Sequence, residues 1–170
     1  MNSTILSLVT LFILVLGVFV VAAENQTTNE SVGNKSKSAN NTSVQPLSLW
    51  VSVNVEPSVL NLGTVPPDGI ERSYPEVATV TVIYFLAFND RLSVRASGDL
   101  VNADGSTIPL SNLKFSTPNV PKRSFTTSDY TILTYSGLRG SRTVPISFYI
   151  TVPFYSDPGT YSVTIIYTAT

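Results

Sequence analysis

LSLWVSVNVE, residues 47–56, is the stretch that decides the fold. Apolar and polar residues alternate along it, with Trp50 the one large aromatic residue in the polar row, and a period of two over ten residues predicts a β-strand with one buried face. Pro57 follows at once and is expected to end the strand. The predicted buried row is Leu47, Leu49, Val51, Val53 and Val55, and the predicted outer row is Ser48, Trp50, Ser52, Asn54 and Glu56.

The same alternation recurs further along the chain, around residues 92–97, 143–152 and 161–169. Residues 77–88 are apolar on both faces, which predicts a central strand or one that meets a neighbouring molecule. Pro145 lacks a backbone donor and favours a sheet edge at its end of the strand. The predicted inward rows are Leu92, Val94 and Ala96; Val144, Ile146, Phe148, Ile150 and Val152; and Tyr161, Val163, Ile165, Tyr167 and Ala169.

Turn signals separate these strands. Residues 65–69, VPPDG, and Asp157-Pro158-Gly159 are turn sequences, and Asp104-Gly105 is typical of a hairpin. Residues 130–135 form a weaker strand, and residues 116–128 are expected to be a loop. About seven to nine strands and no convincing helix predict an all-β, immunoglobulin-like antiparallel β-sandwich over residues 46–170. The chain has no cysteine, so no disulfide supports this sandwich.

The first 45 residues differ from the rest. Residues 5–23 are apolar and uncharged. Val21-Ala22-Ala23 fits a signal-peptide cleavage site, while the length nearly suffices for a membrane anchor; we favour the cleaved signal for residues 1–23. Residues 24–45 are almost entirely polar and are expected to be a disordered stalk.

N-glycosylation sequons crowd that stalk, and none occurs after it. Such sites receive glycan outside the cytosol, so the protein is predicted to be secreted or displayed at the cell surface, with possible membrane attachment left to residues 5–23. The expected glycosylated residues are Asn25, Asn29, Asn34, Asn40 and Asn41.

Composition excludes much enzyme chemistry. The chain has no histidine and no cysteine, which removes the usual nucleophile–base pairs and imidazole or thiolate metal sites. Ten basic and eleven acidic residues leave no charge excess for nucleic acid. No carboxylate pair stands in a recognisable catalytic setting. We therefore expect a protein that is not an enzyme, with no catalytic, cofactor-binding or metal-binding residues.

Two weaker patterns have competing interpretations. Asp99, Asn102 and Asp104 suggest a calcium loop, but Leu100 breaks the ligand spacing, and a hairpin turn is favoured. Lys114 and Lys122 are candidates for a side-chain amide cross-link to Asn or Asp, which no local feature supports.

Aromatic residues on outer faces are candidate contact residues. Trp50, Phe85 and Tyr149 occupy the less apolar rows of their strands, where they would suit an interface. Stacking of Trp50 on a sugar ring is the alternative, and a subunit contact or a cover for the sheet is favoured over it.

The predicted strand at residues 47–56 could pair within its own domain or with a neighbouring subunit. It is expected to be the first strand of its own sandwich. It also has the form of a donor strand that completes a neighbouring subunit, with Leu47, Leu49, Val51, Val53 and Val55 as the inserted residues. The short connection to Val59 favours the first interpretation.

Two segments, VEPSVLNLGTVPPDG (55–69) and DPGTYSVTIIYTAT (157–170), resemble exported immunoglobulin-like fibre and surface proteins. They are similar to camelysin-like matrix fibres, spore-coat-U-type pilus subunits and archaeal thread or bundling-pilus subunits; the sequon-dense, cysteine-free chain suits an archaeal surface best. The resemblance implies a homo-oligomer or filament assembled by strand exchange. The sequence departs from the simplest form of that plan because a polar tail precedes the candidate donor strand.

Two hypotheses for function follow from the sequence. The first is a structural cell-surface protein, a subunit of an extracellular filament or surface layer assembled through β-strand contacts. The second is a membrane-tethered β-sandwich module that recognises carbohydrate or peptide.

Overall fold

The computed structural model describes residues 9–17 and 50–170, which form ten β-strands, one 3₁₀ helix and no α-helix. The predicted all-β sandwich is confirmed, and nine of the ten strands lie in the predicted domain. The elements are β1 (Val9–Gly17), β2 (Trp50–Glu56), β3 (Val59–Val65), β4 (Glu71–Ala96), β5 (Leu100–Val101), β6 (Thr107–Ile108), η1 (Leu110–Asn112), β7 (Leu113–Thr117), β8 (Val120–Ser124), β9 (Tyr130–Thr151) and β10 (Gly159–Ala169).

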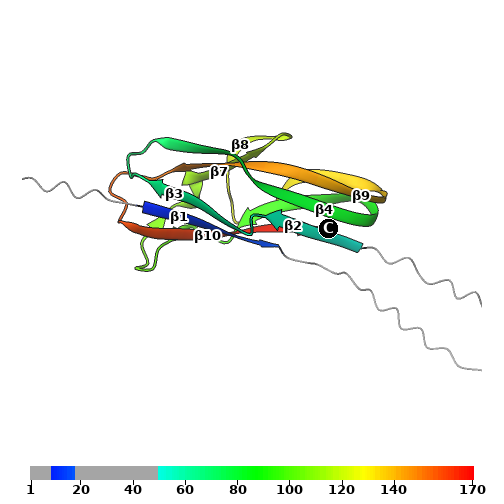
Figure 1. Ribbon diagram of the computed structural model, residues 1–170, viewed down its shortest axis with the longest axis horizontal. Helices are drawn as coiled ribbons and strands as arrows, with labels where there is room; N and C mark the ends of the chain where they lie inside the picture. The colour runs from blue at the N-terminus through cyan, green and yellow to red at the C-terminus, as the bar shows by residue number, and fades with distance from the viewer. Residues whose placement is uncertain (1–8, 18–49) are drawn as a thin grey trace, which may run out of the picture.

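A long antiparallel ribbon of β4 and β9 forms the framework of the molecule (Figure 1). The ribbon bends where its register shifts between Ala87 and Asp90, and Leu86 and Asn89 there have φ values of 59° and 62°. Bulges bend strands because an unpaired residue interrupts the ladder. The two halves of the ribbon therefore belong to different layers of the sandwich.

Each half of the ribbon continues into its own layer. The first half of β4 pairs with β2, and the adjoining half of β9 pairs with β7, which pairs with β8. The second half of β4 pairs with β10, and the order then continues through β1 to β3. The short strands β5 and β6 extend from β10.

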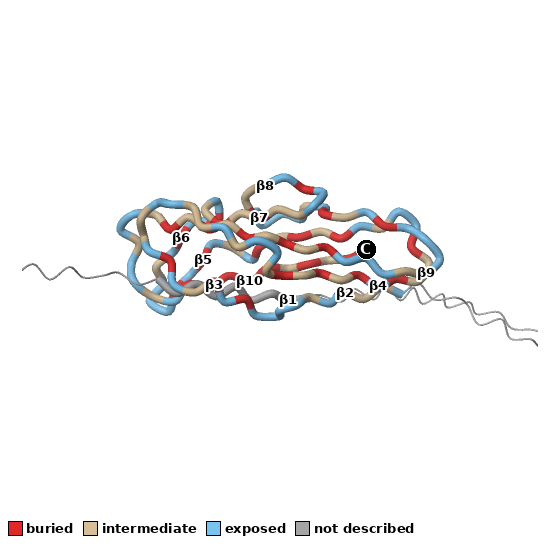
Figure 2. Tube along the Cα trace, turned by 45° about the horizontal axis from the view of Figure 1, so that its top comes forward, coloured by how far each residue is buried: buried red, intermediate tan, exposed pale blue. Residues whose placement is uncertain are grey.

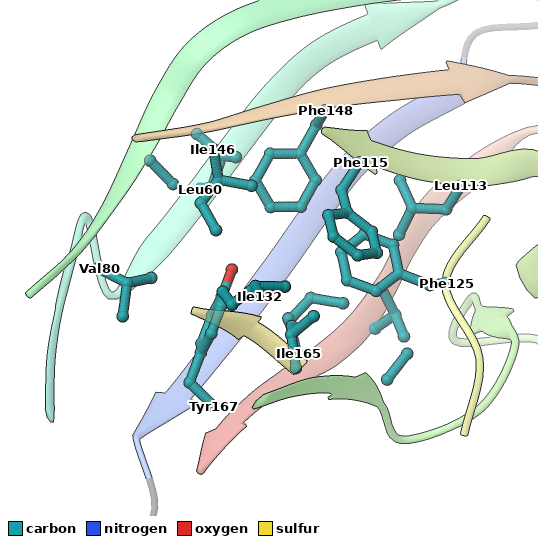
Figure 3. Close-up of a cluster of buried hydrophobic side chains, with 14 of the residues drawn as sticks. Leu60, Val80, Leu113, Phe115, Phe125, Ile132, Ile146, Phe148, Ile165 and Tyr167 are labelled. Atoms are coloured by element: carbon teal, nitrogen blue, oxygen red, sulfur yellow. The ribbon is translucent and has the colours of Figure 1, made fainter. Parts of the chain in front are cut away.

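The core lies between these two layers (Figure 3). Ile146 and Phe148 of β9 and Phe115 of β7 face Ile165 and Tyr167 of β10. All three predicted inward rows, at residues 92–96, 144–152 and 161–169, are buried. Alternation along the strands therefore placed the core correctly.

The two longest strands, β4 and β9, are longer than the strands that the sequence predicted. Residues 77–88 and 92–96 are parts of the single strand β4, and residues 130–135 and 143–151 are parts of β9. The polar and glycine-rich residues between these parts do not end the strands. The β4–β9 ladder continues on both sides of them, and the ribbon bends where the register shifts.

Residues 116–128 are not a loop throughout, and that prediction was wrong. Lys114 and Phe115 of β7 pair with Ser124 and Arg123 of β8, so the region contains a hairpin. The hydroxyl of Thr117 accepts the N–H of Val120 at 3.1 Å, and Phe125 packs on Phe115 with ring centroids 4.6 Å apart. Pairing with β7 and the packing of Phe125 on Phe115 stabilise a strand whose own sequence, VPKRS, is poor in strand signals.

Other local predictions are confirmed. β2 ends at Glu56, directly before Pro57. Gly105 has a φ of 84° in the turn that joins β5 to β6, as the Asp-Gly pair predicted. β7 pairs with β9 from Ser147 to Ile150, which leaves Pro145 beyond it at an edge.

Candidate functional site

A single strand separates β3 from β10, and we call the space it occupies the slot. β1 pairs in parallel with β10 from Val9–Gly159 to Gly17–Tyr167, and antiparallel with β3 from Val9–Val65 to Leu14–Val59. Figure 1 shows β1 between these two strands. β3 and β10 are thus joined through β1 and not directly.

The slot opens onto the core of the sandwich. Strand edges carry rows of N–H and C=O groups that need partners, and a buried edge without them is costly. The slot therefore needs an extended segment to complete the layer formed by β3, β10 and the second half of β4. Its flanks carry the buried residues Leu60, Leu62 and Val65 of β3 and Tyr161, Val163, Ile165 and Tyr167 of β10.

The strand in the slot comes from the apolar segment 5–23 that was expected to be a signal or an anchor. Sequence analysis missed its pairing, although its leucine, valine, isoleucine and phenylalanine content is typical of strands. Removal of residues 1–23, or their use as an anchor, stays a prediction. Within the part of the chain that the structure describes, no helix has the length and apolar character needed to cross a bilayer.

The candidate donor strand is paired within its own chain. β2 lies antiparallel to β4, from Trp50–Phe85 to Glu56–Thr79. Val53 is buried, and Val51 and Val55 are half-buried against the core, while Leu47 and Leu49 lie outside the described residues. This arrangement matches the favoured interpretation, and donation of the strand to a neighbour stays a prediction.

The structure brings together two of the three candidate contact aromatics. Trp50 and Phe85 are directly opposite each other on β2 and β4, and the side chain of Trp50 is 52% exposed. Tyr149 pairs with Ser73, twelve residues before Phe85, and so lies about 40 Å away along the ribbon. Its ring is under the Lys122 ammonium, 4.9 Å from the ring centroid, and its hydroxyl is 3.1 Å from Ser116 Oγ.

Exposed apolar residues that sequence analysis missed gather at the two ends of the molecule. Phe88 and Leu138 lie at the bend of the ribbon, close to Trp50 and Phe85. Ile70, Phe154 and Tyr155 are exposed in the connections at the opposite end, which includes residues 66–70 and 152–158. Aromatic residues inside the turn sequence VPFYSDPG were the signal for the second group.

Lys114 and Lys122 form ion pairs with one carboxylate. Their Nζ atoms lie 2.8 and 2.6 Å from the Glu71 oxygens. The hydrogen bonds from Lys114 and Lys122 lower the pKa of Glu71, and the hydrogen bond to Glu71 raises the pKa of Lys122. The two lysines thus tie the β7–β8 hairpin to the start of β4, and neither contacts an Asn or Asp side chain in the described structure.

The residues suggested for a calcium loop serve the hairpin. Asn102 Oδ1 accepts the N–H groups of Asp104 and Ser106 at 3.1 and 2.8 Å, and Asp99 Oδ1 accepts the N–H of Leu110 at 2.7 Å. Each side chain therefore orders local backbone, as the favoured interpretation expected. In residues 9–17 and 50–170 no group of three or more potential metal ligands occurs. The five sequon asparagines lie outside the described residues.

Comparisons with known proteins do not assign this chain to a family. No family model matches the chain, and no curated protein matches it. Among solved structures it is similar to a family 123 glycoside hydrolase from Clostridium perfringens, with 18% identity and a TM-score of 0.38. The match covers 60% of this chain and 18% of that chain, and at this TM-score it has no bearing on function.

Proposed function

We propose that this chain is a non-enzymatic structural protein of the cell surface, a subunit of an extracellular filament or surface layer assembled through β-strand contacts. The slot between β3 and β10 is the observation that supports the proposal. Residues 50–170 alone leave a gap of one strand between β3 and β10. The strand that fills this gap, β1, comes from the segment that is expected to be removed.

Loss of residues 1–23 would free two facing strand edges. β10 would lose partners for nine residues and β3 for six. An apolar segment of a second copy can restore these hydrogen bonds and cover the core beneath, which is the logic of strand addition. Because the donating segment and the accepting slot are different surfaces, the contact is heterologous and repeats into a filament.

The composition supports an exposed location. The predicted glycosylated stalk, with Asn25, Asn29, Asn34, Asn40 and Asn41, would require export. Only 12% of the residues are charged, which suits a packed assembly better than an isolated soluble domain.

The decisive experiment combines N-terminal sequencing with negative-stain imaging of the secreted protein. We expect a chain that starts near Glu24, carries glycan and forms filaments or sheets. Dispersed monomers that also start near Glu24 would contradict the proposal. So would an intracellular chain without glycan.

A second candidate function is a tethered module that binds carbohydrate or peptide. The exposed Trp50 beside Phe85 favours it, because a flat aromatic surface suits ring stacking. Binding to a glycan or peptide array, lost in Trp50→Ala and kept in the exposed control Tyr155→Ala, would support this function over assembly.

A further inference from the structure

The sandwich carries an exposed apolar patch at each of its two ends. The bend patch, at the fold of the β4–β9 ribbon, comprises Trp50, Phe88 and Leu138. The loop patch, on the connections at the other end, comprises Ile70, Phe154 and Tyr155. Phe88 is 73% exposed, Leu138 65% and Tyr155 99%, so each patch presents large side chains to solvent.

The body is elongated (Figure 2), and the β4–β9 ribbon sets the two patches at its opposite ends. β4 runs from Glu71, next to the loop patch, to Phe85, next to the bend patch. Fourteen residues of strand at about 3.3 Å each separate the patches by about 45 Å. One chain therefore cannot bring its own two patches together.

The loop patch is held in place by its backbone. Tyr155 is a non-glycine residue with a φ of 64°, a conformation that costs free energy and that the surrounding structure must impose. The ring of Phe154 packs on Gly69, where an added Cβ would lie 2.8 Å from the ring, and the Phe154 and Tyr155 ring centroids are 6.5 Å apart. This end thus displays two neighbouring aromatic rings on a fixed turn.

The net charges around the two patches are opposite in sign, because three arginines outnumber the half-buried Asp90 at the bend and the exposed, unpaired carboxylates lie at the other end. Arg91, Arg139 and Arg142 are exposed around the bend, and none forms an ion pair with a described residue. Asp104 and Asp157 are exposed on the loops of the other end, where Ser106 Oγ donates to Asp157 at 2.6 Å. Asp68 and Glu71 at that end are already paired with Arg72, Lys114 and Lys122.

We infer that the bend patch of one copy binds the loop patch of the next, so that copies join head to tail along the long axis. Apolar surface meets apolar surface, and the free arginines face the free aspartates. The slot runs along the same axis, since β1, β3 and β10 all extend from one end towards the other. This inference rests on the proposed function and names its end-to-end interface.

Cysteine cross-linking tests the contact directly, because the natural chain contains no cysteine. Leu138→Cys and Tyr155→Cys are made in the full-length chain and co-expressed in a secreting host with different tags. We expect a disulfide-linked heterodimer from the pair and no linked homodimer from either variant alone. Asn54→Cys, exposed midway along β2, replaces Leu138→Cys in the control and should give no heterodimer with Tyr155→Cys.

The outcomes separate the two proposals. Filaments in the micrographs without the heterodimer, or linked homodimers of one variant, would overturn the head-to-tail contact and leave the proposed function standing. Absence of any assembly from the processed chain would overturn the proposed function itself. Phe88→Asp should reduce filament yield about tenfold, and added salt should weaken assembly of the unaltered chain because screening reduces the attraction between the charges.

Discussion

Leu60 of β3 and Val163 of β10 share one backbone partner, Ile13 of β1. Since neighbouring strands lie about 4.8 Å apart, β3 and β10 are separated by about 10 Å, which is room for one strand. Both Leu60 and Val163 are buried core residues. The completeness of the core therefore depends on whichever segment occupies this position.

The first prediction concerns that occupant. A chain that begins at Glu24 should self-associate, whereas the full-length chain, with β1 in the slot, should stay monomeric in detergent. Light scattering after size-exclusion chromatography measures the difference. Equal monomer fractions for the two chains would contradict it.

Amide hydrogen exchange can show which residues lose protection when β1 is absent from the slot. Residues 159–164 of β10 have β1 as their main ladder partner, with one further pairing of Ser162 to Val101. Their amides should exchange quickly in a monomer that lacks β1 and slowly in its assembled form. Residues 168 and 169, which pair with β4 and lie beyond the β1 ladder, serve as the internal control.

The second prediction compares adjacent residues of β2. Val53 is buried in the core and Asn54 is exposed on the outer face. Val53→Asp should lower the free energy of unfolding by about 3 kcal/mol, because it buries a charge without a partner. Asn54→Asp should change it little, as measured by urea denaturation. A Val53→Asp chain that stays as stable as the parent would indicate that β2 is donated to a neighbour.

The third prediction concerns the close approach of Tyr84 to Gly140. A Cβ at Gly140 would lie 2.5 Å from Tyr84 Oη and 2.8 Å from its Cζ. Gly140→Ala should therefore destabilise the ribbon by about 1–3 kcal/mol through overpacking. Gly98→Ala is the matched control, since a Cβ there meets no atom within 4 Å. Thermal unfolding of the two variants side by side checks the difference.

The fourth prediction concerns alkaline stability. Burial, with smaller effects of Asp90 and Tyr84, raises the pKa of Tyr135 from 10.0 to about 12, and burial also raises the pKa of Tyr167. Above pH 10 the unfolded chain loses these protons while the folded chain retains them. Stability should therefore be constant up to pH 10 and fall as the pH rises towards 12.

Phenylalanine substitutions test this explanation. The hydroxyls of Tyr135 and Tyr167 are buried and have no hydrogen-bond partner among the described residues. The double variant Tyr135→Phe/Tyr167→Phe should lose much of the decline between pH 10 and 12, and should gain up to about 1 kcal/mol at neutral pH. An unchanged pH profile of the melting temperature would show that other groups cause the alkaline loss.

Local sequence patterns were sufficient to predict the strands that have one buried and one exposed face. Rows such as Val144 to Val152 were predicted because a strand with one buried face must alternate. The hairpin at Asp104-Gly105 was predicted because few residue pairs tolerate its turn. Strand β8 was missed because its position depends on core packing of Val120 and of Phe125, which directly follows the strand and stacks on the distant Phe148.

Sequence alone determined the fold class and the buried faces of most strands in residues 50–170, because side-chain alternation is a local property of the backbone. Only the tertiary structure decided which strands are neighbours, because pairing depends on contacts between residues far apart in the chain. It placed Val9–Gly17 between β3 and β10, joined Trp50 to Phe85 and separated both from Tyr149. It also set Phe88 and Tyr155 at opposite ends of the body, because the bend of one long ribbon fixes where each end lies.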